Sequence, residues 1–491
     1  MELNQTSISY YDRRLARTAT CNETADSIVP DTFPDIGRVV CAYGVASIKD
    51  QSPQNDRLLV SGVVKTTVVY QPEEGGGLRR LSIPISFAHI EDCEGLDANT
   101  VCYVQCSVAG IEATAVNSRK LSVNAQLCFE MDGYQKADCT VTESVSGTDI
   151  ELMCTPCTVS LIEQTQVSQF TVLEDVNLPD AADLALLHTQ CALRVSECRA
   201  MHGKVVLKGE AAITCLALQE DDAVRVLTSS TPFTQIIEMN DVSENDMVAA
   251  RLSAREVDCR LEPDGLLSYT IGGSALFTVR RMQTLKNIDD LYIPGKQLHL
   301  KEEKVTIHTM PPTTQAMAEA SETLQTAQRA SHIISSTAVC CGVKQKEKDE
   351  AVLTTSVQIL YLNEDQQLCS LQRTLPLTVS CTSRGVLSQV ELNARATPSG
   401  EQGIALTVSM TGQIAAESRC TFRNIDSYEV SESEGVNSGI TLVLRFIDQE
   451  QPLWDIAKAC GTTVNAIRQA NELPSEAAAV SNTMLLIPIQ S

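Results

Sequence analysis

The stretch LLVSGVVKTTVVY, residues 58–70, alternates apolar side chains with polar or small ones. A period of two is typical of a β-strand with one buried face. Similar stretches recur as KVVLKGEAAITCLAL at 204–218 and AVLTTSVQILYL at 351–362. Each is followed by a polar turn and a second strand-like stretch that contains a proline: Pro84 in LSIPISF, Pro232 in SSTPFTQII and Pro376 in RTLPLTVSC. The pattern predicts antiparallel strands in three copies.

The spacing of these landmarks indicates a repeated unit. The prolines are 148 and then 144 residues apart, and Gly147 and Gly295 are also 148 apart. This period exceeds the roughly 20–50 residues of solenoid repeats and favours duplicated globular domains. We expect a mainly β chain with three tandem antiparallel β-sandwich-like domains, at residues 1–160, 161–310 and 311–427. Because proline cannot donate to a β-ladder, the three prolines are expected on edge strands or at bulges.

Two segments depart from the strand pattern. TQAMAEASETLQTAQRA, residues 314–330, has high helix propensity and predicts a helix between the second and third units. SYEVSESEGVNSG, residues 427–439, is acidic with few apolar side chains, so we expect a linker over 428–439. A separate small domain should follow at 440–491.

The last fifty residues predict the order βααβ. ITLVLRFI at 440–447 and the terminal MLLIPI are typical strands. Between them, Leu453, Ile456, Ala457 and Cys460 share one helix face, Gly461 ends that helix, and Thr462 or Thr463 can cap a second one. The predicted core consists of Leu442, Leu444, Trp454, Ile456, Ile467, Leu486 and Ile487.

LWDIAKACGTTVNAIRQAN and the terminal LLIP resemble a LysM domain over residues 440–489. The resemblance implies an N-acetylglucosamine groove between two loops. LysM domains usually carry Gly-Asp-Thr or Gly-Glu-Ser before Leu-Trp, whereas Glu450, Gln451 and Pro452 stand here. Losing the glycine and a backbone donor disfavours glycan binding. The residues expected to bind a partner or a glycan are Gln449, Glu450, Gln451, Pro452, Trp454, Leu473, Pro474, Ser475 and Glu476.

Trp454, the only tryptophan of the chain, allows two interpretations. It is either a core residue of the small domain or a partly exposed anchor in a protein interface, where tryptophan is enriched. The two roles are compatible.

SIVPDTFPDIGRVV at 27–40 and the weaker VNLPDAADLALL at 176–187 carry Pro-Asp pairs, which favour structural turns over catalytic carboxylates. With tandem β-rich units and a C-terminal LysM, they resemble the clostridial spore-coat morphogenetic proteins of the SipL type. The resemblance implies a non-enzymatic scaffold in the mother-cell cytoplasm, at the forespore surface. Its LysM would bind the ATPase of the coat basement layer, alongside other coat proteins. Binding of peptidoglycan or N-acetylglucosamine is the alternative.

Composition narrows the range of partners. The net charge of −24, from 38 basic and 62 acidic residues, argues against nucleic acid and anionic membranes. No apolar stretch reaches eighteen residues, so no membrane span is expected. The start of the sequence lacks an apolar leader, so we expect the chain to stay in the compartment that made it.

No motif predicts chemistry. The 19 cysteines are scattered, often in apolar runs, which favours reduced thiols over a disulfide framework. CTPC, Cys154 to Cys157, has no second ligand pair for zinc and reads as strand. EEGGGLRR at 73–80 joins two strands and favours a hairpin loop over a phosphate site. We therefore expect no catalytic residues, cofactor or metal; an enzyme with an unrecognised site in the β-domains is the remaining alternative.

Overall fold

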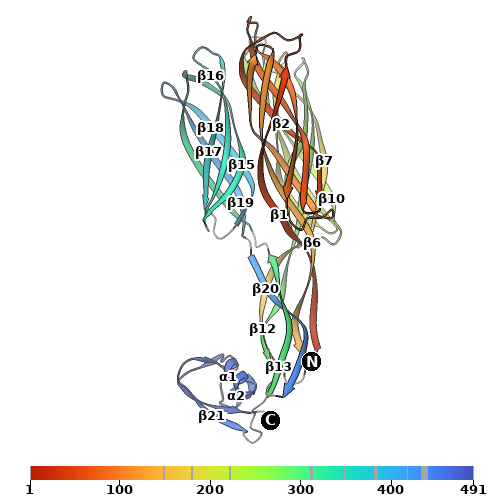
Figure 1. Ribbon diagram of the computed structural model, residues 1–491, viewed down its shortest axis with the longest axis vertical. Helices are drawn as coiled ribbons and strands as arrows, with labels where there is room; N and C mark the ends of the chain where they lie inside the picture. Colours follow the sequence, from red (N-terminus) through yellow and green to blue (C-terminus); the bar gives the residue numbers. More distant parts are fainter. Residues whose placement is uncertain are drawn as a thin grey trace.

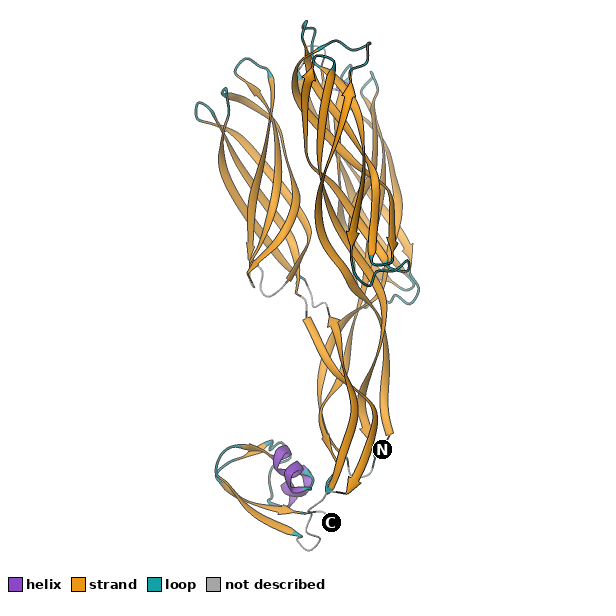
Figure 2. Ribbon diagram, viewed as in Figure 1, coloured by secondary structure: helices purple, strands orange, loops and turns teal. Residues whose placement is uncertain are grey.

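The computed structural model describes residues 2–147, 150–178, 181–219, 223–309, 313–347, 350–380, 385–416, 418–432 and 441–489. The molecule is elongated, with long twisted sheets at one end and a narrower group of strands at the other (Figure 1). The helices of the described residues belong to a small C-terminal domain beside the narrow end (Figure 2). The fold class is mainly β with a small α+β domain, as predicted.

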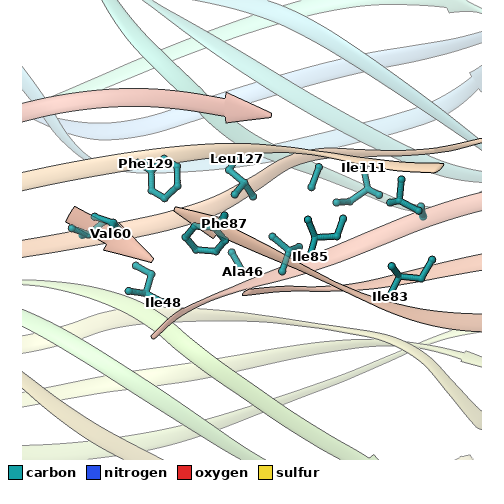
Figure 3. Packing of buried hydrophobic residues seen from close by; sticks show 14 of the residues in the cluster. Ala46, Ile48, Val60, Ile83, Ile85, Phe87, Ile111, Leu127 and Phe129 are labelled. Carbon is teal, nitrogen blue, oxygen red and sulfur yellow. The ribbon is translucent and has the colours of Figure 1, made fainter. Parts of the chain in front are cut away.

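The first repeat forms two antiparallel sheets, ordered β1-β6-β5 and β2-β3-β4. The central strand β3 contains the LLVSGVVKTTVVY stretch, and its residue Val64 is completely buried. Phe87 on one sheet meets Phe129 on the other, with ring centroids 5.6 Å apart (Figure 3). The strands are β1 (Glu2–Ile28), β2 (Ile36–Gln54), β3 (Arg57–Pro72), β4 (Arg79–Asp92), β5 (Val101–Asn117) and β6 (Lys120–Ser146).

The second repeat has the same connections, with sheets β11-β12-β7 and β10-β9-β8. KVVLKGEAAITCLAL forms its central strand β9. The strands are β7 (Glu151–Asn177), β8 (Ala185–Met201), β9 (Lys204–Leu218), β10 (Val224–Glu238), β11 (Met247–Leu261) and β12 (Leu266–Tyr292).

The third repeat has sheets β14-β19-β18 and β15-β16-β17, and a separate pair β13-β20. AVLTTSVQILYL lies in its central strand β16. The strands are β13 (Lys296–Thr309), β14 (Thr314–Gln325), β15 (Ala330–Glu347), β16 (Glu350–Asn363), β17 (Leu368–Ser380), β18 (Gly385–Ser399), β19 (Gly403–Ala416) and β20 (Ser418–Glu432).

The narrow part of the molecule is a stalk of three two-stranded ribbons, one from each repeat (Figure 1). It consists of the start of β1 with the end of β6, the start of β7 with the end of β12, and β13 with β20. A two-stranded ribbon is marginally stable by itself, so the ribbons depend on a shared core. The buried residues of that core are Ile8, Tyr10, Val141, Val159, Leu161, Leu285, Ile307 and Phe422.

Above the stalk, the sandwiches contact one another through apolar and ionic clusters. Arg251 of the second repeat donates to Glu130 of the first at 2.9 Å and also bonds Asp132. Arg13 donates to Asp132 at 2.8 Å from its Nε. The Asp132 side chain is only 2% exposed, so two guanidinium groups compensate one buried carboxylate. The apolar contact joins all three repeats through Val40, Cys41, Tyr43, Val69, Leu187, Leu216, Leu360 and Leu368.

The prolines lie where predicted. Pro84, Pro232 and Pro376 sit in β4, β10 and β17, each the outer strand of its sheet. An outer strand has one side without a ladder partner, so a residue without an N–H costs little there.

The helix expected over 314–330 is wrong. Thr314–Gln325 form β14, which pairs antiparallel with β19. Ala316 and Leu324 are buried in the core of the third repeat. Helix propensity is worth less than about 1 kcal/mol per residue, so sheet pairing and burial outweigh it.

The repeats begin earlier along the chain than the expected boundaries. The second starts with β7 at Glu151 and the third with β13 at Lys296. Residues 428–432 of the expected linker belong to β20, and residues 433–439 lie outside the described part of the chain.

Candidate binding site in the C-terminal domain

The C-terminal domain has the predicted βααβ order. Strands β21 (Leu442–Ile447) and β24 (Thr483–Pro488) pair antiparallel, with α1 (Leu453–Cys460) and α2 (Val464–Ala470) between them in sequence. Gly461 ends α1 with a left-handed φ of 65°. Thr463 caps α2 by accepting from the backbone N–H of Ala466 at 3.0 Å.

Asn471 joins the second helix to the last strand. Its side-chain amide donates to the carbonyls of Ile467 and Leu486 at 2.7 and 2.6 Å, and its oxygen accepts from the N–H of Leu486 at 2.7 Å. One polar side chain therefore satisfies three backbone groups and fixes α2 against β24.

The predicted core is correct in part. Ile456, Ile467 and Ile487 are buried, whereas Leu442 and Leu444 are 50% and 62% exposed. Leu486 is half-buried. Both faces of β21 and β24 carry apolar residues, so the sequence pattern does not tell which face is buried. A change of register by one residue exchanges the two faces. The buried core is Tyr292, Ile447, Leu453, Ile456, Ala457, Ile467, Val480, Leu485 and Ile487.

The first of the two loops expected to bind a glycan pairs with the chain segment that follows the second loop. Gln451–Pro452 form the short strand β22, which pairs with β23 (Ala479–Val480). The N–H of Leu453 donates to the carbonyl of Ala478 at 2.8 Å, and Arg468 donates to the carbonyl of Ala477 at 2.7 Å. Gln449, Glu450, Pro452, Pro474, Ser475 and Glu476 are exposed, and Gln451 and Leu473 are half-buried.

Trp454 contacts the stalk. Its indole Nε1 donates to Oδ2 of Asp290 at 2.8 Å, and its ring meets Tyr292 edge-on at 4.9 Å between centroids. Lys458 on the same helix donates to both oxygens of Asp290, at 2.8 and 2.6 Å. Trp454, one of the nine expected site residues, thus lies in the contact between the C-terminal domain and the end of β12.

Further contacts complete this docking interface. The Tyr292 hydroxyl donates to the carbonyl of Thr462 at 2.9 Å. A Cβ placed on Gly461 would come within 3.2 Å of the backbone nitrogen of Gly295, so the turn after α1 approaches the stalk closely. Nothing local in the sequence marks Asp290 or Tyr292, because their partners lie about 165 residues later.

The interface shifts the pKa of its acidic groups. Burial by itself raises the pKa of Asp290, but the hydrogen bonds from Lys458 and Trp454 outweigh it and hold that pKa below its usual range. Burial raises the pKa of the Tyr292 hydroxyl, and the negative charges of Glu151 and Asp290 raise it further. Asp290 is therefore ionised, and Tyr292 neutral, at physiological pH.

The outer face of the β21–β24 pair is an apolar patch. Leu442, Leu444, Phe446 and Met484 are 50–62% exposed. Phe446 pairs directly with Met484, and Leu444 pairs with Leu486, so the side chains are adjacent across the strands. The helices lie on the side of the domain nearer the stalk (Figure 1). We refer to Leu442, Leu444, Phe446 and Met484 as the apolar patch.

The first Pro-Asp motifs and the glycine-rich segment form a turn and a strand connection in the structure. Arg119 donates to Asp31 and Asp35 at 3.1 and 3.0 Å and to the carbonyl of Phe33 at 2.8 Å, so the first pair of Pro-Asp motifs is held in a turn. Pro179 and Asp180 lie outside the described residues. The glycine-rich segment at 73–80 connects β3 to β4, with positive φ at Gly75, Gly76 and Gly77.

Side chains suited to binding a metal ion do not gather in the described residues. There, no group of three or more His, Cys, Asp or Glu side chains is arranged to hold a metal ion. Each cysteine that the structure describes is a free thiol. In the same part of the chain, no helix is both long and apolar enough to cross a membrane.

Comparison with known families agrees with this architecture. The SipL SPOCS domain matches residues 35–116 and 184–262, which hold β2–β5 of the first repeat and β8–β11 of the second. The LysM domain matches residues 452–488. No curated protein and no solved structure matches the chain. Two SPOCS segments followed by a C-terminal LysM domain match the resemblance to SipL-type proteins that the sequence predicts.

Proposed function

We propose that this protein is a non-enzymatic scaffold of endospore coat assembly, and that its LysM domain binds the morphogenetic ATPase of the coat basement layer. The SPOCS and LysM domains make it a sporulation-related protein with binding domains. The proposed location is the mother-cell cytoplasm, at the forespore surface, where other coat proteins would join.

The apolar patch is the observation that carries the proposal. Four large apolar side chains on one small sheet face favour contact with a protein, because exposed apolar patches mark such interfaces. A sugar ligand needs polar groups that hydrogen-bond its hydroxyls, and the patch offers none from its side chains.

The architecture supports a scaffold. The stalk holds the LysM domain at the opposite end of the molecule from the sandwiches (Figure 1). The contacts of Asp290 and Tyr292 fix the orientation of the domain, which leaves the patch on the side away from α1. A domain held this way can bind one partner while the sandwiches contact others.

Binding of peptidoglycan or N-acetylglucosamine is the second candidate. The match to the LysM domain over residues 452–488 supports it, because the resemblance to LysM domains implies an N-acetylglucosamine groove. Pro452 at the start of α1 counts against glycan binding, because it removes a backbone N–H donor from the first loop.

Two full-length variants separate the candidates. Leu444→Ser with Phe446→Ser changes the apolar patch, whereas Gln451→Ala with Ser475→Ala changes the loops. Retention of the purified ATPase on immobilised protein should be lost in the patch variant and kept in the loop variant. Binding of chitin oligomers, lost only in the loop variant, together with no retention of the ATPase by the unaltered chain, would establish the glycan alternative instead.

A further inference from the structure

Two cysteine thiols from different repeats meet in the stalk. Cys157 lies in β7 of the second repeat and Cys420 in β20 of the third, and their Sγ atoms are 2.9 Å apart. The two residues are 263 positions apart in the sequence. Both are free thiols and partly exposed, so a small molecule can reach them.

The contact is made by side chains alone. Cys157 pairs in its ribbon with Leu285, and Cys420 pairs in its own ribbon with Ile307. The shared apolar core of the stalk brings the two ribbons together, and both cysteines pack against that core. Their proximity therefore depends on the association of two repeats.

The CTPC spacing suggests a different partner, Cys154. Side chains three positions apart on a strand point to opposite faces. Cys154 packs against another cluster, with Val145, Ile288, Leu291 and Ile425, whereas Cys157 packs with the core that includes Cys420. The fold thus separates the two cysteines of the motif.

We propose that Cys157 and Cys420 are a redox-sensitive pair whose disulfide joins the second and third repeats within the stalk. A disulfide has an S–S bond of about 2.05 Å, so the two sulfurs would need to approach by only about 0.9 Å more. The reduced pair is the state that the structure describes.

A low-molecular-weight disulfide, such as oxidised glutathione, supplies the oxidant. One cysteine thiolate attacks it, releases one glutathione thiol and leaves a mixed disulfide on the protein. The second cysteine thiolate attacks the protein sulfur of that mixed disulfide and releases the second glutathione. The two protein thiols lose two protons and two electrons, and the two glutathione thiols carry them away.

The disulfide would fix the strands next to the LysM domain. β20 is the last strand before that domain in sequence, and β7 begins at Glu151, which accepts from the backbone N–H of Val464 in α2. Cross-linking residues so distant in sequence restricts the unfolded chain strongly, so oxidation should raise the temperature of thermal unfolding.

The test uses the full chain, treated with oxidised glutathione, alkylated and digested without reduction for mass spectrometry. A linkage between Cys157 and Cys420 is expected in the unaltered chain, and an equal yield in the control Cys154→Ser. In Cys420→Ser, Cys157 should carry glutathione instead. The oxidised unaltered chain should unfold at a higher temperature than the reduced one, and Cys420→Ser should lose that difference.

Three results would overturn the proposal. These are a linkage of Cys157 to Cys154, separate glutathione adducts on Cys157 and Cys420 of the unaltered chain, or an undiminished thermal shift in Cys420→Ser. The close pair Cys215 and Cys259, 3.8 Å apart in the second repeat, gives an internal comparison, because Cys215 is completely buried and should react more slowly.

Discussion

Trp454 donates its indole N–H to the carboxylate of Asp290 across 2.8 Å, although 164 residues separate them. The contact joins helix α1 of the LysM domain to the end of β12, and Lys458 reinforces it from the next turn of the helix. The only tryptophan of the chain thereby reports on the docking of this domain to the stalk.

Asp290→Ala should release the docking contact. Losing a charged hydrogen-bond acceptor costs about 1.5–3 kcal/mol. The Lys458 pair adds about 0.2–1 kcal/mol, because that side chain is 45% exposed. Water should then reach the indole, so Trp454 fluorescence should move to longer wavelength. The control is Asp289→Ala, because Asp289 bonds Thr155 instead; an unchanged spectrum in the Asp290 variant would contradict the predicted docking.

The docking contact should be lost in acid. The pKa of Asp290 is held below its usual range in the docked state, so its stabilising effect is complete above the undocked value of about 3.9. It disappears as the pH falls through the lower, docked value. A fluorescence titration should therefore show a Trp454 transition with its midpoint below about 3.9. Asp290→Asn should lack this transition, and its presence there would assign the change to another group.

Arg251→Ala should destabilise the contact between the first two repeats. The substitution would leave the negative charges of Glu130 and Asp132 less fully compensated, and Asp132 is buried. Removing one partner of a buried ion pair costs about 3–5 kcal/mol. Urea unfolding should show this loss, whereas Arg260→Ala, which removes a pair between highly exposed side chains, should cost about 0–1 kcal/mol. Equal effects of the two variants would be inconsistent with a structural role for the cluster.

Gly62→Ala should destabilise the first sandwich. Gly62 pairs directly with Phe87, whose ring covers it, and a Cβ there would lie 2.2 Å from the carbonyl oxygen of Ser47. Overpacking of this kind costs about 1–3 kcal/mol, measurable as a lower melting temperature. Gly272→Ala is the matched control, because its nearest neighbour would be the Cβ of Glu256 at 3.6 Å. A Gly62 variant as stable as the control would contradict this prediction, because it would show that the strand moves to accommodate the added methyl group.

The sequence by itself determined most of the strands, the presence of a repeated unit and the outline of the LysM domain. These depend on local patterns: the alternation in LLVSGVVKTTVVY, prolines tolerated on outer strands, and Gly461 and Thr463 at helix ends. The alternation does not say which face is buried when both faces are apolar. The pattern therefore predicts Leu442 and Leu444 in the core, whereas the structure exposes them.

Only the tertiary structure decided which distant residues meet. The three ribbons of the stalk, the bond from Trp454 to Asp290 and the contact of Cys157 with Cys420 join positions more than a hundred residues apart. Such contacts follow from how the repeats pack, and packing energy depends on shape and burial across the whole molecule. Long-range packing also explains why the helix expected at 314–330 does not form. Pairing with β19 outweighs the local helix propensity of this segment.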